Sequence, residues 1–164
     1  MEPEVVGAIW GGLTGSTVTG GFALISQLLQ KRQAHEADSR KRSEAAAVEC
    51  RRVLHQIADV PEKDHEYGFD GSTLSGLADE FIGELAGHLY REVELISDAP
   101  TREDLLAVQR AILDHYPISK TLGVSQVAVL YALTAYGLDV VASYLRGDAS
   151  PSRSSEIVRI LQTS

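Results

Sequence analysis

The stretch Val5–Leu29, VVGAIWGGLTGSTVTGGFALISQLL, is the part of the sequence that most strongly determines the architecture we predict for the chain. Its 25 residues carry no charge, and 13 of them are apolar. Because a helix rises about 1.5 Å per residue, the stretch is long enough to cross a hydrocarbon core of about 30 Å. The basic residues Lys31 and Arg32 follow it at once. We therefore predict a single transmembrane helix here, with the rest of the chain on one side of the membrane.

The small residues of this stretch lie in two rows. Residues four apart share one side of a helix, and small residues there let two transmembrane helices approach closely. The rows are Gly7, Gly11 and Gly15, and beside them Gly12, Ser16 and Gly20. The sequence therefore predicts a homodimer formed through the span.

Three alternatives to a transmembrane helix fit the stretch less well. A cleaved secretory signal would carry a basic leader, whereas Glu2 and Glu4 precede this stretch. A phosphate-binding loop would need the lysine of GxxxxGK[ST], which the run GGLTGST lacks. The alternative that stays open is a glycine-rich stretch that is disordered or forms a helix of a soluble core.

Basic residues gather on the C-terminal side of the stretch. They are Lys31, Arg32, Arg40, Lys41 and Arg42. Lysine and arginine remain on the cytoplasmic side of a span, so we predict a plasma-membrane protein with its N-terminus outside and its bulk in the cytoplasm. The same residues could contact anionic lipid head groups. For Arg40–Arg42 the simpler interpretation is orientation alone, because Glu36, Asp38 and Glu44 dilute the positive charge.

The net charge of −8 is unevenly spread along the chain. Residues 31–58 hold seven bases and four acids, whereas residues 59–98 hold eleven acids and two bases. An acidic middle disfavours nucleic acid as a partner, because such proteins present a basic face to phosphate. The single cysteine, Cys50, has no intramolecular disulfide partner and is interpreted as an ordinary helix residue in a reducing compartment.

The remaining sequence predicts an all-α fold in three parts: an anchor over residues 1–30, a stalk helix over 31–60, and a cytoplasmic helical domain over 61–164. The stalk is rich in helix-forming residues and ends before Pro61. Large apolar residues at helical spacing begin only at Val53, so we expect a solvated stalk that enters the domain there.

Four helical segments are expected in the domain, after a loop over residues 61–73. The first has an apolar row at helical spacing, which comprises Leu74, Leu77, Phe81, Leu85, Leu89, Val93 and Ile96. A second starts at the N-cap candidate Thr101 and is ended by His115, Tyr116 and Pro117. A third runs from near Ser125 to Gly147, and the last from Pro151 to Leu161.

The third of these segments is expected to lie at the centre of a small helical bundle, packed around residues 127–145, with Tyr131 buried. The run Thr121–Leu138 has 18 residues without charge, so a second membrane span is the alternative. Ser125, Gln126 and Thr134 favour the core helix over the span.

Candidate chemistry in the sequence is sparse. Glu80, Glu84 and His88 lie four apart on one helix face, which suits a metal or an acid–base group, although a solvated face is the simpler interpretation. The loop around Asp64, His65, Glu66 and Asp70 is a candidate for a weak cation site, although an ordinary acidic loop is the simpler interpretation. Cys50 and His55 lack an orienting third group. No catalytic residue and no cofactor are predicted.

Three functions fit this layout. The first is a membrane-anchored helical interaction module that recruits or regulates an unknown cytoplasmic protein, with membrane lipid as its other partner. The second is an enzyme or metal-binding domain that uses Glu80, Glu84 and His88. The third is a small membrane-active protein with a second span at residues 121–138. The lack of a catalytic constellation favours the first.

Overall fold

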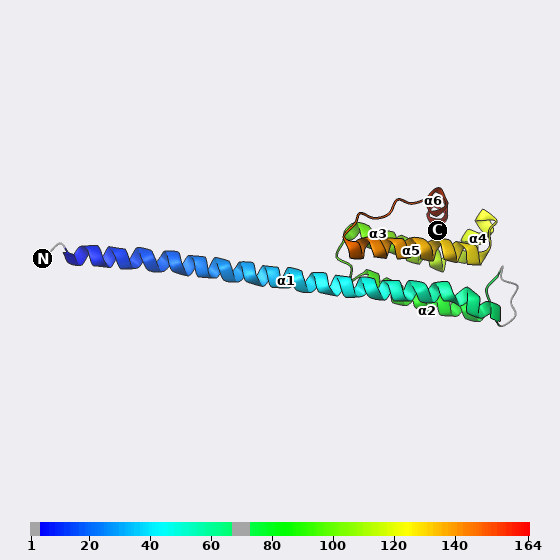
Figure 1. Ribbon diagram of the computed structural model, residues 1–164, viewed down its shortest axis with the longest axis horizontal. Helices are drawn as coiled ribbons and strands as arrows, with labels where there is room; N and C mark the ends of the chain where they lie inside the picture. The colour runs from blue at the N-terminus through cyan, green and yellow to red at the C-terminus, as the bar shows by residue number, and fades with distance from the viewer. Residues whose placement is uncertain (1–3, 67–72) are drawn as a thin grey trace. The chain divides into compact units, whose positions relative to one another are not determined.

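The computed structural model describes residues 4–66 and 73–164, and the side chains of residues 30–64 and 73–164. It divides into two compact units, Met1–Arg40 and Lys41–Ser164. All regular structure in the described residues is helical, as Figure 1 shows. The helices are α1 (Glu4–Glu66), α2 (Gly76–Val93), α3 (Ala99–Leu113), α4 (His115–Leu122), α5 (Gln126–Arg146) and α6 (Ser155–Leu161). This confirms the predicted all-α class.

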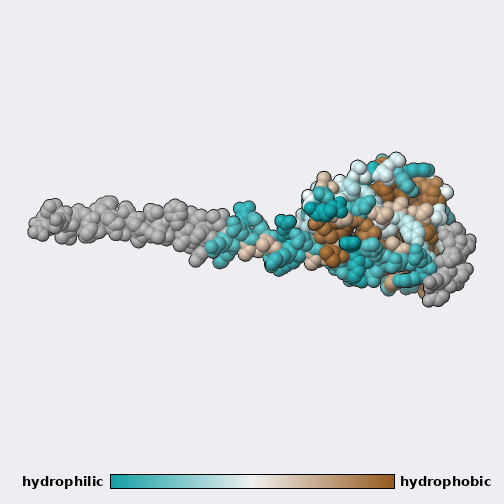
Figure 2. Space-filling model, in the orientation of Figure 1, coloured by the Kyte–Doolittle hydropathy of each residue, from teal (hydrophilic) through white to brown (hydrophobic). Residues whose placement is uncertain are grey.

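The regular structure of the first unit consists of the N-terminal part of α1 alone. The backbone of Val5–Leu29 is helical, but its side chains and their two rows of small residues lie outside the described residues. Nothing in the structure supports or tests its insertion in a membrane, which stays a prediction. From Gln30 to Arg42 every side chain is exposed, and this segment is largely hydrophilic in Figure 2.

The later part of α1 belongs to the core of the second unit, which corrects the predicted stalk. Buried positions begin at Ser43, about three turns before Val53, because small side chains bury there. They are Ser43, Ala46, Ala47, Cys50, Val53, Leu54, Ile57 and Val60. Pro61 does not end the helix, which continues to Glu66. Burial of Val60, Pro61 and Asp64 against the bundle holds the chain helical past a residue that normally disrupts a helix.

Helix α2 confirms the predicted helix and the later part of its apolar row, Leu85, Leu89 and Val93, but not the first part. The buried residues are Ala78, Ile82, Leu85, Ala86, Leu89 and Val93. Leu77 and Phe81, which we expected in the core, are 81% and 46% exposed. The physical reason is the helical spacing: Ala78 shares one side of the helix with the buried Ile82, Leu85 and Leu89, whereas Leu77 lies on the outer side. The helix begins after the N-cap Ser75, whose hydroxyl accepts a hydrogen bond from Ala78 N at 3.1 Å.

The structure also corrects the predicted start of α3 and the predicted end of the helical segment. The N-cap is Asp98, not Thr101: its carboxylate accepts hydrogen bonds from Thr101 N at 3.0 Å and Thr101 Oγ1 at 2.6 Å. Pro100 lies in the first turn, where the missing N–H costs nothing. The same tolerance places Pro117 in the first turn of α4, so His115, Tyr116 and Pro117 begin a helix instead of only ending one.

Helix α5 runs through the second unit as predicted, from the N-cap Ser125 to Gly147, whose φ of 75° suits glycine at a helix end. At Gly137 the backbone approaches its neighbours closely: a Cβ there would lie 3.1 Å from Leu54 Cδ1 and 3.3 Å from Val108 Cγ1. Helix α5 therefore packs directly on α1 and α3.

Tyr131 is 40% exposed, which corrects its predicted place in the core. It lies on the side of α5 that neighbours the charged end of α1. The pKa of Tyr131 is raised, first by partial burial and then by Glu62 and Asp59.

Among the described residues, α5 is the one helix whose length and composition would suit a membrane crossing. Half of its apolar stretch is buried, and α3, α4 and α6 pack against it. Core packing explains its apolar composition. Helix α6 closes the bundle through buried Ile157 and Ile160 and begins at Ser155, after the Ser154 cap, rather than at Pro151.

Candidate functional site

An open apolar groove of about 350 Å³ lies between the end of α1 and the start of α2. We call it the Leu77 groove. It is lined by Val60, Lys63, Asp64, Ser75, Leu77, Ala78 and Phe81. Leu77 and Phe81 are one helical turn apart on α2 and both are exposed, while Val60 on α1 is almost fully buried. The result is a pair of large apolar side chains that stay exposed among the residues whose side chains are described.

A buried carboxylate holds the two walls of this groove together. Asp64 on α1 accepts hydrogen bonds from Ser75 N at 2.9 Å and from Ser75 Oγ at 2.6 Å. Next to this pair, Gln126 Oε1 of α5 accepts a hydrogen bond from Leu74 N at 3.0 Å. Asp64 therefore links the end of α1 to the start of α2. The other members of the predicted cation site, His65, Glu66 and Asp70, lie outside the residues whose side chains are described.

The predicted trio of Glu80, Glu84 and His88 does not converge on one point. Glu80 and Glu84 are exposed, whereas His88 Nε2 lies 3.5 Å from Glu49 Oε1 and 3.6 Å from Glu92 Oε1. Within residues 30–64 and 73–164, no group of three histidine, cysteine, aspartate or glutamate side chains is spaced to hold a metal. The arrangement favours surface ion pairs over acid–base chemistry.

Cys50, which follows Glu49 on α1, is buried and chemically inert. Burial raises the pKa of its thiol to about 12, and the nearby charges of Glu92 and Glu49 add to the increase. Because the thiolate is the nucleophile, Cys50 is not a reactive group at neutral pH. His55, the other half of the sequence pair, is exposed.

His115 is a buried polar contact that the sequence did not predict. Its Nδ1 donates to the carbonyl oxygen of Ile112 at 2.8 Å, and its Nε2 lies 3.1 Å from Asp79 Oδ1. The ring thus joins the α3–α4 corner to α2. A histidine two residues before a proline at a helix junction was the available signal, but its partner on another helix could not be predicted from spacing.

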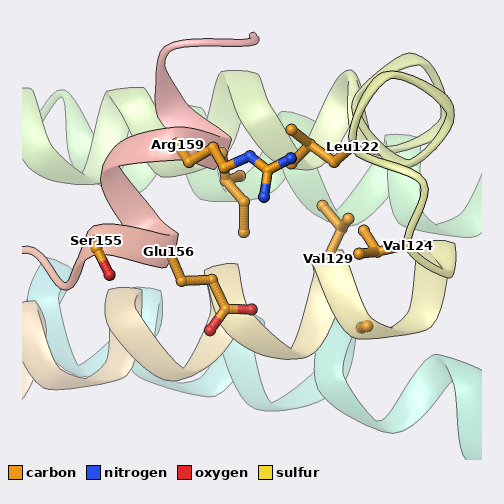
Figure 3. Close-up of a pocket in the computed structure, with 8 residues that line it drawn as sticks. Leu122, Val124, Val129, Ser155, Glu156 and Arg159 are labelled. Atoms are coloured by element: carbon orange, nitrogen blue, oxygen red, sulfur yellow. The ribbon is translucent and has the colours of Figure 1, made fainter.

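A second cavity, of about 360 Å³, lies between the α4–α5 corner and α6. Its lining comprises Leu122, Val124, Ala128, Val129, Ser155, Glu156, Arg159 and Ile160. In Figure 3, Arg159 extends across the opening toward Leu122, while Glu156 points toward α5. Its lining is apolar apart from Ser155, the anion Glu156 and the cation Arg159, so it would suit a small zwitterion with an apolar side.

The five basic residues predicted at a membrane surface all have exposed side chains. They are Lys31, Arg32, Arg40, Lys41 and Arg42. Arg32 Nε also donates to Glu36 Oε1 at 3.0 Å, one turn along the helix. Exposure agrees with a contact to lipid head groups but does not test it.

Comparison of the whole chain with protein-family models, with curated proteins and with solved structures finds no match.

Proposed function

We propose that the chain is a membrane-anchored helical interaction module that recruits or regulates a cytoplasmic protein. The observation that carries the docking role is the exposed pair Leu77 and Phe81 in the Leu77 groove. Adjacent large apolar side chains that a bundle leaves uncovered are typical of protein–protein contacts. Aromatic side chains are also enriched at such contacts.

The anchor in this proposal is Val5–Leu29, with the unit Lys41–Ser164 in the cytoplasm. Its support is an uncharged segment of 25 residues inside a helix, followed by exposed basic residues at Lys31 and Arg32. Positive charge on this side of the span favours a cytoplasmic location for the helical bundle. The same basic residues would meet anionic lipid.

A homodimer through the span is part of the same proposal. The rows Gly7/Gly11/Gly15 and Gly12/Ser16/Gly20 support it, because small residues one turn apart allow close helix contact. Neither the metal-binding alternative nor the second span gains support from packing, since His88 contacts Glu49 and Glu92 rather than Glu80 and Glu84, and α5 is half-buried.

The proposal is tested with single cysteines in the full-length chain. Cys50 is buried and serves as a silent background, so a membrane-impermeant maleimide should report only an introduced thiol. We expect intact cells to be labelled at Glu4→Cys and not at Ser152→Cys, an exposed position beyond α5, with both labelled after lysis. If alkaline carbonate extracts the chain from membranes, the anchor is contradicted. If Ser152→Cys is labelled in intact cells, the predicted orientation is contradicted.

Recruitment is tested separately by a photoreactive residue in place of Leu77. Leu95 is a matched control because it is also an exposed leucine, 58% exposed, but does not line the groove. We expect a crosslinked protein product from position 77 that is absent from position 95. Equal products at both positions would argue against a docking role for the groove.

A further inference from the structure

The sequence around the Leu77 groove carries more negative than positive charge. Residues 59–98, which contain both walls of the groove, hold eleven acids and two bases. Of the two bases, Lys63 lines the groove and Arg91 lines the hollow next to it on α2. On α2, Glu80 lies three residues after Leu77, and Glu84 lies three after Phe81. Residues three and four apart share one side of a helix, and both glutamates are exposed. Each apolar side chain of the groove is thus accompanied by a carboxylate.

A second hollow continues along α2 from Phe81. It is lined by the apolar Phe81 and Leu85 and by Glu84, Gly87, His88 and Arg91. From Leu77 to His88 the helix rises about 16 Å. Two neighbouring helices with apolar side chains on successive turns offer a groove into which the side-chain ridge of a third helix can pack.

We infer that the Leu77 groove binds an amphipathic helix of a partner protein whose apolar face is flanked by lysine or arginine. The apolar residues of that helix contact Leu77, Phe81 and Val60, and its basic residues meet Glu80 and Glu84. The inference rests on the proposed docking role of this groove and adds the chemistry of the partner. Charge complementarity of this kind sets specificity and association rate more than affinity.

The chain's own basic segment does not have this chemistry. Residues 30–42, QKRQAHEADSRKR, are exposed and rich in lysine and arginine, but alanine is their only apolar residue type. A segment without large apolar side chains cannot fill a groove formed by a leucine and a phenylalanine. The occupant is therefore a different protein rather than the basic segment of a second copy.

The test uses three synthetic helical peptides of about five turns each. The first carries leucine on one face and lysine on the flanks, the second replaces every lysine by glutamate, and the third keeps lysine and replaces every leucine by glutamine. Binding to the full-length chain in a neutral detergent is followed by fluorescence anisotropy. We expect the leucine–lysine peptide to bind at least about tenfold more tightly than either of the others.

One matched pair of variants and one double variant locate the binding. Leu77→Ser should weaken binding of the leucine–lysine peptide about tenfold or more, and Leu95→Ser, the same exchange outside the groove, should not change it. Since all variants share one detergent, partition of peptide into micelles cancels in the comparison. Glu80→Gln with Glu84→Gln should reduce the preference for lysine over glutamate and its dependence on salt.

Equal or tighter binding of the leucine–glutamate peptide would overturn the inferred chemistry, and so would an unchanged affinity in Leu77→Ser. These outcomes are separate from failure of the proposed function. If Leu77 crosslinks a protein at the membrane while the glutamate peptide is preferred, docking stands and only the basic partner is excluded. If the lysine peptide is preferred but the maleimide pattern contradicts the anchor, the groove chemistry stands without the membrane role.

Discussion

Helix α2 carries two apolar surfaces that meet different surroundings. Its inner surface, with Ala78, Ile82 and Leu89, is buried against the bundle. Its outer surface, with Leu77 and Phe81, is exposed beside the end of α1. Both surfaces have helical spacing and similar side chains, so hydrophobicity alone does not separate them. The difference teaches that burial depends on which side of the helix packs on the bundle, and that contacts distant in sequence, such as the one between Asp64 and Ser75, hold the helix in place.

The largest effect should come from truncating the same residue type on the two surfaces. Leu89 is fully buried and Leu77 is not. We expect Leu89→Ala to lower the free energy of unfolding by about 2–5 kcal/mol, through lost burial and a residual cavity. Leu77→Ala should change it by less than about 0.5 kcal/mol. Urea unfolding of the full-length chain, followed by circular dichroism, measures both, and similar losses would mean that Leu77 is packed.

A smaller loss of stability is expected from placing a side chain at a glycine in the core. A side chain at Gly137 would meet Leu54 and Val108 at 3.1–3.3 Å, whereas a Cβ at Gly87 on α2 meets nothing within 4 Å. Gly137→Val should therefore lower the free energy of unfolding by about 1–3 kcal/mol. Gly87→Val should leave it unchanged or raise it slightly, because valine has the higher helix propensity. A stable Gly137→Val variant would show that α5 can move away from α1.

The contact that orients α2 can be removed with a matched control. Ser75→Ala removes an N-cap and one hydrogen bond to buried Asp64, while Ser125→Ala removes an N-cap with no such partner. We expect Ser125→Ala to cost about 1 kcal/mol. Ser75→Ala should cost about 1 kcal/mol more, because a buried carboxylate loses a donor. Equal costs from thermal unfolding of the two variants would mean that Asp64 does not fix the start of α2.

The smallest effect concerns Asp98, the cap of α3, which lies outside both surfaces of α2. The Thr101 hydroxyl, and then the Thr101 amide, lower the pKa of its carboxyl by hydrogen bonding. A lowered folded-state pKa contributes stability that is fully present above the ordinary aspartate pKa of about 3.9. That stability is lost as the pH falls through the folded-state pKa.

Asp98→Asn keeps a capping side chain without the charge. Between about pH 5 and about pH 2, the free energy of unfolding should therefore change less with pH in Asp98→Asn than in the wild-type chain. Parallel pH curves for the two chains would mean that the cap does not depend on the charge of Asp98.

Much of the fold could be predicted from local signals. The ends of α5 follow from Ser125 and Gly147, since a serine cap and a glycine with positive φ each have a local cause. The all-α class follows from helical spacing throughout the domain. These features depend on few residues that lie close together in the sequence.

The candidate site could not be predicted, because it depends on contacts distant in sequence. Leu77 and Ala78 both belong to rows at helical spacing, and size favours Leu77 for the core. The structure buries Ala78 together with Ile82, Leu85 and Leu89, and the start of this helix is bonded to Asp64, eleven residues before Ser75. Early burial at Ser43 escaped prediction for a similar reason: its hydroxyl accepts a hydrogen bond from Ser97 N at 2.9 Å, a partner on another segment.

The central claim is that the outer surface of α2 is uncovered in the free protein and available to a partner. Hydroxyl-radical footprinting of the full-length chain, read by mass spectrometry, tests it most directly because oxidation follows solvent access. We predict strong oxidation of Leu77 and Phe81, little of Ile82 and Leu89, and selective protection of the first pair when the leucine–lysine peptide is added. Oxidation of Leu77 and Phe81 as weak as that of Leu89 in the free chain would contradict the account.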